Sequence, residues 1–374
     1  MNTAALPYPR PDTAAVAGAL ATAAVPFRDL LGTIRADELL ALVRTELGHE
    51  RILDGFQPHG PDDHLALARA REPILHVISG NTPHAGLQSL IRGLLVGAHN
   101  LCKLPGGYVL PELPAFRAAL PPWLARRVEF SETLPDAWLA RAGTVIVFGS
   151  DDTVDALHRR LRPDQAFVAH GHRVSLALIL DDPGGESLPA AARAVSLFDQ
   201  RGCLSPHVLY VRGEALRYAA GLAGEMARFN AHTPRVALSP AEAAPIMSLR
   251  EEWRFRAAND PAGHALWHSQ GSTAWTVLYD GLDPAFTASP LQRAVYVKPL
   301  PDDLPAALAT VRPFVSTVGL WPARTEDAAA LAALDLGASR FCPLDRMQLP
   351  PLTWHQDGSP PLSALVRWID FEPG

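Results

Sequence analysis

The sequence predicts an α/β protein built from two α/β units. The first observation is a β-α-β-α-β alternation between residues 74 and 182, which is typical of a parallel, doubly wound sheet. The second is a further set of strand-like segments after residue 275. The third is the length of 374 residues, which exceeds the usual size of a single hydrophobic core. We therefore expect two domains that share one interface.

The composition argues against several classes of protein. Hydrophobic residues make up 48% of the chain and charged residues 19%, as in ordered globular proteins. A formal net charge of −6 gives no basic field for nucleic acid or anionic lipid, so we expect neither as a partner. Three cysteines, odd in number and far apart, suggest no disulfide framework and favour a cytoplasmic location. The apolar stretch 14–25 is too short to span a bilayer, so we expect no membrane insertion.

Residues 1–73 are expected to form an N-terminal helical arm. The segment 37–43 has helical periodicity, and the segment 66–69 is expected to form a second helix. At the other end of the chain, the proline-rich segment 343–361 is expected to be an extended wrapping segment.

The first unit begins with an apolar strand at 74–78 that is stopped by a loop containing glycine and proline at 79–83. A helix follows, since apolar residues recur at helical spacing from 87 to 95. The loop thus lies at the carboxyl end of a strand and the start of a helix. Open α/β sheets bind ligands at such positions, where free backbone N–H groups favour anions.

The rest of this unit continues the same alternation. Strands are expected at 100–104, 144–148, 166–169 and 174–180, with helices from 115 and at 152–161. Gly149 and Ser150 form the turn after one of these strands. A G-x-G-x-x-G motif is absent from the sequence, so the usual dinucleotide fingerprint is missing.

The second unit starts at a helix over 190–197 and the stretch F-D-Q-R-G-C-L-S-P at 198–206. Strands are expected at 208–211, 276–279, 294–297 and 314–318, and a helix at 215–229. Cys203 follows a glycine at the edge of this β-rich segment, which makes it a plausible thiolate nucleophile. The alternative is a small buried apolar residue, which is the commoner role of a lone cysteine and our interpretation of Cys102 and Cys342.

Four segments, at 78–83, 97–105, 148–150 and 198–206, occur in the order and rough spacing of the aldehyde dehydrogenase superfamily. The chain most resembles the acyl-CoA reductases of the LuxC type, and the segments 352–358 and 365–370 are similar to the C-terminal end of that family. The resemblance implies an aldehyde-dehydrogenase-like fold, with a Rossmann-type cofactor domain and a second α/β catalytic domain. We therefore expect the arm and nucleotide-binding domain at 1–198, the catalytic thiol domain at 199–343 and the wrapping segment at 344–374.

The resemblance also implies roles for individual residues. Cys203 would attack the substrate carbonyl, and the Asn81 side chain with the Cys203 backbone N–H would stabilise the oxyanion. Lys103 matches the lysine that contacts the adenosine ribose. From the residues alone, Asn81 could be a turn residue and Lys103 a solvated charge at a strand end. The residues implied to bind the cofactor are Ser79, Gly80, Lys103, Gly149, Ser150 and Gly171.

Two absences bear on the chemistry. The residues 104–107 beside Lys103 include no carboxylate, whereas sites for NAD usually provide one, so we expect NADPH, with NADH as the less favoured cofactor. Aldehyde-oxidising relatives carry a glutamate base where this chain has Ala-His-Gly-His at 169–172. Loss of that base favours thioester chemistry, in which water is unwanted. His170 and His172 are expected to share one face of a strand, and no metal is expected because further ligands are not evident.

We expect the chain to reduce an acyl-CoA, or an acyl group on a carrier protein, to an aldehyde through an acyl-enzyme on Cys203. The alternative is a catalytically silent member of the fold that serves as a scaffold or as an acyl-carrier docking subunit. A serine hydrolase is disfavoured because the sequence has no G-x-S-x-G motif. The superfamily resemblance implies a homodimer or a higher oligomer.

Overall fold

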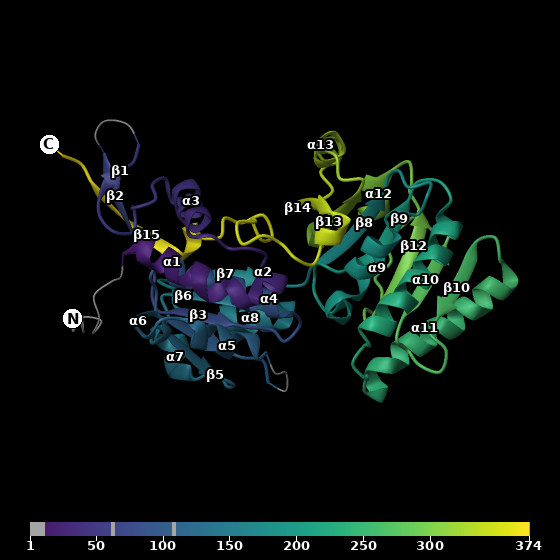
Figure 1. Ribbon diagram of the computed structural model, residues 1–374, viewed down its shortest axis with the longest axis horizontal. Helices are drawn as coiled ribbons and strands as arrows, with labels where there is room; N and C mark the ends of the chain where they lie inside the picture. Colours follow the sequence, from purple (N-terminus) through teal and green to yellow (C-terminus); the bar gives the residue numbers. More distant parts are fainter. Residues whose placement is uncertain (1–11, 61–63, 107–109, 374) are drawn as a thin grey trace. The chain divides into compact units, whose positions relative to one another are not determined.

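The computed structural model describes residues 12–60, 64–106 and 110–373, which divide into two compact units. Unit 1 comprises Met1–Gly171 and Pro351–Gly374, and unit 2 comprises His172–Pro350. Each unit is described by itself (Figure 1). These units do not follow the expected boundaries at 198 and 343. The strand that we expected at 174–180 joins the second sheet, because it is hydrogen-bonded between two strands of unit 2.

Unit 1 is built on a five-stranded parallel sheet with the order β5-β4-β3-β6-β7. Strand β3 lies at the centre and is buried on both faces, as is usual in parallel sheets. The chain runs from β3 outward to β5 and then returns to β6 on the other side of β3. This reversal creates a topological switch point between β3 and β6. Sheets of this kind bind ligands at the carboxyl ends of the two strands that flank such a point. The strands are β3 (Ile74–Val77), β4 (Asn100–Lys103), β5 (Val128–Ser131), β6 (Thr144–Phe148) and β7 (Ala166–His170).

The long helix α4 (Pro83–Leu95) is buried along most of its length, because it packs between the sheet and other helices. In Figure 1, the purple helix α1 (Thr13–Ala24) lies beside it, and α1 also contacts α3 and α5. The helix expected at 37–43 is confirmed by α3. The other helices of unit 1 are η1 (Val25–Phe27), α2 (Arg28–Leu31), α3 (Ala36–Leu47), α5 (Glu112–Ala119), α6 (Pro122–Ala125), α7 (Asp136–Arg141), α8 (Asp151–His158) and η5 (Ser363–Leu365).

In the part of the chain that the structure describes, one helical stretch, Thr13–Leu31, is long and apolar enough to cross a membrane by length and composition. Core helices of soluble proteins and signal sequences meet the same criterion. Val16 and Leu20 of this stretch are 1% and 0% exposed in the core of unit 1. The expectation that the chain does not insert into a membrane stays a prediction.

Residues 65–70 are a strand, so the helix predicted at 66–69 is wrong. Strand β2 (Leu65–Ala70) pairs antiparallel with β15 (Val366–Phe371) along its full length, and β1 (Gln57–Pro58) joins its other edge. The segment is rich in alanine, leucine and arginine, which favour helix locally. Pairing with a strand about 300 residues away in the sequence overrides this weak preference.

Unit 2 contains a seven-stranded sheet with the order β10-β11-β12-β9-β8-β13-β14, in which only β10 is antiparallel to its neighbour. Alternate side chains of the strands form two apolar clusters, one on each face. Helices α9 and α10 cover one face, while α11, α12 and α13 contribute to the other. The strands are β8 (Val174–Ile179), β9 (Pro206–Val211), β10 (His264–His268), β11 (Thr276–Asp280), β12 (Ala294–Pro299), β13 (Val315–Trp321) and β14 (Arg340–Pro343).

The sequence did not predict α11, although it is a 20-residue helix. Its buried residues Ile246, Arg250 and Trp253 form a narrow stripe, and the remaining apolar residues are spread around the helix. The helices of unit 2 are α9 (Leu188–Ser196), η2 (Leu197–Gln200), α10 (Ala215–His232), α11 (Pro240–Asn259), α12 (Leu304–Leu308), η3 (Arg312–Phe314), α13 (Thr325–Ala333) and η4 (Leu344–Arg346).

Candidate active site

Cys203 lies in the short segment between η2 and β9, and it is the exposed cysteine of the three. Cys102 is fully buried in β4, and Cys342 is 8% exposed in β14, which confirms their interpretation as buried apolar residues. Burial raises the pKa of both thiols, that of Cys342 to about 11. The thiolate is the nucleophilic form of cysteine, so these two residues are poor nucleophiles at neutral pH. The fold therefore leaves Cys203 as the thiol available for chemistry.

The backbone before Cys203 is held in a conformation that non-glycine residues rarely adopt. Phe198, Asp199 and Gln200 have φ angles of 52°, 55° and 60°, and each such residue costs of order 1–3 kcal/mol. The fully buried Gln200 side chain supports this turn: its Nε2 donates to the carbonyl oxygens of Pro206 at 2.9 Å and Ala294 at 2.8 Å. Its Oε1 accepts from the Ala294 N–H at 2.8 Å. The Gln200 side chain thus connects the residues before and after Cys203 to the start of β12.

A second left-handed turn, at Leu291, Gln292 and Arg293, meets the first one. These residues have φ angles of 63°, 57° and 63°. The Arg293 guanidinium lies 2.6 Å from the Asp199 carboxylate, and both groups are largely shielded from solvent. Breaking such a buried pair is strongly destabilising, because one charge is left uncompensated. The two turns therefore stabilise each other.

A third contact fixes the Cys203 peptide itself. Ser175 lies in β8 with no exposed surface, and its Oγ donates to the Cys203 carbonyl oxygen at 2.7 Å. The same Oγ accepts from the Thr317 N–H of β13 at 3.3 Å. The orientation of the Cys203 backbone is thus set by two central strands of the sheet. This matters because the proposed oxyanion donor includes the Cys203 N–H, and such donors act only when held in place.

His207 follows Cys203 closely but is a structural residue. Its Nδ1 accepts a hydrogen bond from the Ser289 N–H at 3.0 Å, so any ring proton of the neutral form is on Nε2. Burial lowers the pKa of His207 to about 4, and the charge of His172 adds to this effect. At neutral pH the ring is uncharged and provides no cation for a thiolate.

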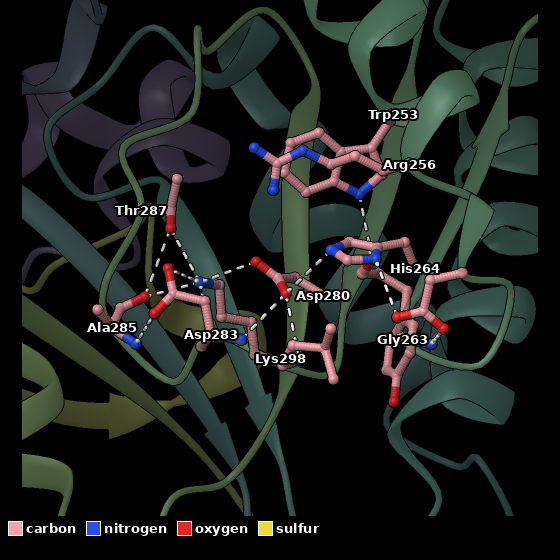
Figure 2. A network of polar contacts seen from close by, with 12 residues as sticks. Trp253, Arg256, Gly263, His264, Asp280, Asp283, Ala285, Thr287 and Lys298 are labelled. Carbon is pink, nitrogen blue, oxygen red and sulfur yellow. Dashed lines mark hydrogen bonds and ion pairs between the residues drawn. The ribbon is translucent and has the colours of Figure 1, made fainter. Parts of the chain in front are cut away.

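The loop that carries Ser289 is anchored by a buried ammonium group (Figure 2). Lys298 of β12 is 0% exposed, and its Nζ donates to Asp283 O at 2.9 Å, Ala285 O at 2.7 Å and Thr287 Oγ1 at 2.8 Å. The Asp280 carboxylate, also buried, lies 3.4 Å away and supplies the countercharge. The loop 283–287 is therefore wrapped around one charge. Sequence reasoning missed this network, although a lysine within the apolar strand pattern at 294–299 was a signal for it.

In unit 1, the residues predicted to bind the cofactor gather at one edge of the sheet. Ser79 and Gly80 follow β3, Lys103 ends β4, and the turn of Gly149 and Ser150 follows β6. These strands are parallel neighbours, so their carboxyl ends lie side by side at the switch point. Helix α4 begins at this edge, so the positive end of its dipole lies there.

The turn after β6 is closely fitted to the strand beside it. The Gly149 N–H donates to the His170 carbonyl oxygen at 3.2 Å, and Ser150 caps α8 by accepting from the Thr153 N–H at 3.4 Å. A Cβ atom at Gly171 would lie 2.5 Å from the Asp151 carboxylate, so only glycine fits there without a shift. Glycines in the turns at the carboxyl ends of parallel strands let a dinucleotide come close to the backbone, so these turns suit such a ligand. Of the stretch 104–107, Gly107 lies outside the described residues.

The expectation that His170 and His172 share one strand face is wrong. Strand β7 ends at His170, and His172 belongs to unit 2. The His170 Nδ1 lies 2.7 Å from the Asp357 carboxylate, and its ring stacks on Phe148 at 4.7 Å. This pair attaches the C-terminal segment to the sheet of unit 1. Among the described residues, no group of three or more His, Cys, Asp or Glu side chains is placed to hold a metal ion.

The two halves of the predicted site lie in different units. Cys203 belongs to unit 2, whereas Asn81, which is exposed, and the cofactor loops belong to unit 1. The structure groups the predicted cofactor residues with one another at one sheet edge. The role of Asn81 toward Cys203 stays a prediction.

Comparison with known proteins gives a family match over most of the chain. The family model described as acyl-CoA reductase (LuxC) matches residues 13–106 and 123–368. The long-chain acyl-protein thioester reductase of Aliivibrio fischeri is 22% identical over 355 residues, which cover 89% of this chain and 70% of that protein. The protein of the same name from Photorhabdus luminescens is 24% identical over 356 residues, with the same coverage of 89% and 70%.

Solved structures confirm the predicted fold. The gamma-glutamyl-gamma-aminobutyraldehyde dehydrogenase of Burkholderia cenocepacia J2315 superposes with a TM-score of 0.66 at 13% identity, over 96% of this chain and 84% of that one. The NAD-dependent benzaldehyde dehydrogenase of Corynebacterium glutamicum gives a TM-score of 0.62 at 13% identity, over 97% and 86%. At this identity the likeness concerns the fold, which is that of the aldehyde dehydrogenases.

Proposed function

The chain belongs to the acyl-CoA reductase (LuxC) family, and on this basis we propose that it reduces an acyl thioester to an aldehyde through a covalent intermediate on Cys203. The observation that carries the assignment of Cys203 is the contrast among the three thiols. Two of them are buried, with raised pKa values, while Cys203 is exposed on a segment fixed by Gln200 and Ser175.

The chain supplies the groups that the first half of the reaction needs. The Cys203 thiolate attacks the thioester carbonyl, and the carbonyl oxygen takes on negative charge. The Cys203 N–H and the Asn81 amide are the proposed donors to this oxyanion, and one well-placed donor of this kind contributes about 3–4 kcal/mol. Collapse of the intermediate breaks the bond to the leaving thiolate, which takes up a proton, and leaves the acyl group on Cys203.

The second half of the reaction needs a reduced nicotinamide, which when bound supplies the hydride. The loops at the carboxyl ends of β3, β4, β6 and β7 suit a dinucleotide, because Gly80, Gly149 and Gly171 lie there together with the start of α4. Asn81 and the Cys203 N–H hold the second oxyanion as they hold the first. Its collapse releases the aldehyde and restores the thiolate.

The residues near the end of β7 favour reduction over hydrolysis. Residues 169–172 contain no carboxylate to activate water, whereas aldehyde-oxidising relatives carry a glutamate base there. Without a general base for water, the acyl-enzyme persists until hydride arrives. This supports thioester reduction rather than aldehyde oxidation.

We propose NADPH in preference to NADH as the hydride donor. Lys103 ends β4 at the sheet edge where the adenosine half is expected, and residues 104–107 supply no carboxylate to repel a 2′-phosphate. The proposed acyl donor is acyl-CoA or an acyl-carrying protein, the latter because the relatives are named for acyl-protein thioesters. A homo-oligomer in the cytoplasm is the proposed setting.

The test is cofactor consumption by the purified full chain with acyl-CoA substrates of short, long and aromatic acyl groups. We expect NADPH absorbance to fall, and an acyl adduct to appear on Cys203 by mass spectrometry when NADPH is omitted. Cys203→Ala should abolish both signals, whereas the control Cys342→Ala should retain them. An active Cys203→Ala variant would remove Cys203 from the mechanism, and the absence of turnover with every acyl donor would contradict the function.

A further inference from the structure

A cavity of about 510 Å³ lies at the amino-terminal edge of the five-stranded sheet in unit 1. Its walls come from β2, β15 and the segments that precede β3, β4, β5, β6 and β7. This edge is opposite to the carboxyl ends that carry the predicted cofactor loops. The charged residues of its lining are Arg69, Arg71, Arg127, Arg367, Glu72 and Asp164.

The two carboxylates of this cavity are engaged elsewhere. The guanidinium of Arg162, which is not part of the lining, binds both oxygens of Asp164 at 3.0 and 3.2 Å. This contact holds the pKa of Asp164 below its usual range. Glu72 accepts from the His99 N–H at 2.9 Å and faces Arg127 at 3.9 Å. Neither carboxylate therefore forms an ion pair with the other three arginines of the lining, Arg69, Arg71 and Arg367.

Those three arginines, Arg69, Arg71 and Arg367, have no carboxylate within 4.0 Å in the described part of the chain. Arg69 and Arg367 stand directly opposite each other in the pairing of β2 with β15. Like charges in this position destabilise a strand pair. Arg71 donates its Nε to the Val366 carbonyl oxygen at 3.0 Å, which leaves its two Nη groups for other acceptors. Three arginines thus line one cavity and have no carboxylate partner among the described residues.

We propose that this cavity binds a small phosphorylated molecule through Arg69, Arg71 and Arg367. The planar guanidinium presents its N–H donors in a fork that matches the oxygens of a phosphate group. A phosphate also removes the repulsion between Arg69 and Arg367. The volume is within the range of small-molecule pockets, which favours a compact ligand over an acidic protein. The site is separate from the cofactor edge, so the inference goes beyond the proposed reaction.

Isothermal titration calorimetry of the full chain with pyrophosphate tests this proposal. We expect one pyrophosphate to bind per chain. In the double variant Arg69→Gln/Arg367→Gln, the dissociation constant should rise at least tenfold. Arg44→Gln, which changes an exposed arginine of α3 outside the cavity, is the matched control and should bind as the unaltered chain does. Thermal unfolding checks the fold: the double variant should unfold without ligand at the same or a higher temperature, since a repulsion has been removed.

Three outcomes would overturn the proposal. The first is no measurable binding by the unaltered chain, and the second is an equal loss of binding in Arg44→Gln. The third is binding that survives in the double variant but is lost in Lys103→Met, which would locate pyrophosphate at the cofactor loops. Titrations with inorganic phosphate and adenosine diphosphate then identify the source of the phosphate. Tighter binding of either one, lost in the double variant, supports the site.

Discussion

Replacing Lys298 by methionine removes the ammonium group that the loop 283–287 surrounds. Methionine keeps a similar unbranched shape, so the substitution mainly removes the positive charge and its hydrogen-bond donors. It leaves the Asp280 carboxylate, 3% exposed, without the cation 3.4 Å away, and it leaves three oxygen acceptors without their donor. Breaking a buried ion pair from one side costs about 3–5 kcal/mol. We expect Lys298→Met to lower the free energy of unfolding by that amount.

Urea unfolding measures this loss, and amide hydrogen exchange shows whether it is concentrated in residues 280–298. Arg324→Met is the matched control, because Arg324 pairs with Asp181 at 3.7 Å on the surface, where an ion pair contributes at most about 1 kcal/mol. Combining Lys298→Met with Asp280→Asn should recover part of the stability, since the unpaired charge is then absent. If Lys298→Met cost no more than Arg324→Met, the buried network would not be what holds the loop beside His207.

Three further predictions concern Cys203 and its surroundings. Iodoacetamide near neutral pH should modify Cys203 much faster than Cys102 and Cys342, as read by peptide mass spectrometry, whereas equally slow labelling would favour the catalytically silent scaffold. Ser175→Ala should lower the free energy of unfolding by about 1 kcal/mol and reduce turnover, because the Cys203 carbonyl oxygen loses its donor. Ser316→Ala is the control, because the buried Ser316 Oγ has no hydrogen-bond partner among the described residues, and it should have little effect on turnover. Equal losses of turnover in the two variants would argue against a positioning role for Ser175. Because the pKa of His207 is lowered to about 4 in the fold, the unfolded chain takes up a proton first as pH falls, so the free energy of unfolding should decrease between about pH 6.5 and 4. His207→Asn, which retains an acceptor near Nδ1, should flatten this decrease in urea titrations, and an unchanged pH profile would contradict the assignment.

The central strands of both sheets were predictable from the sequence, because each is a short apolar run ended by a glycine or proline. Strands β3, β4 and β6 and the loops after them occur where they were expected. The stretch around Cys203 was also recognisable from the sequence, because its signal is local. A glycine, a cysteine and a proline in a fixed local order carry a signal that does not depend on distant residues.

Only the tertiary structure decided the features that join residues far apart in the chain. Residues 65–70 became a strand because β15 lies beside them, and β8 joined the second sheet because β9 and β13 flank it. The left-handed turn at 198–200 depends on Ala294 and Arg293, which are more than 90 residues later in the sequence. Local propensity favours one conformation over another by about 1 kcal/mol per residue or less, whereas a buried hydrogen bond or ion pair with a distant partner outweighs that preference. The sequence by itself therefore determined the fold class, the family and the candidate thiol, and the long-range contacts determined how that thiol is held.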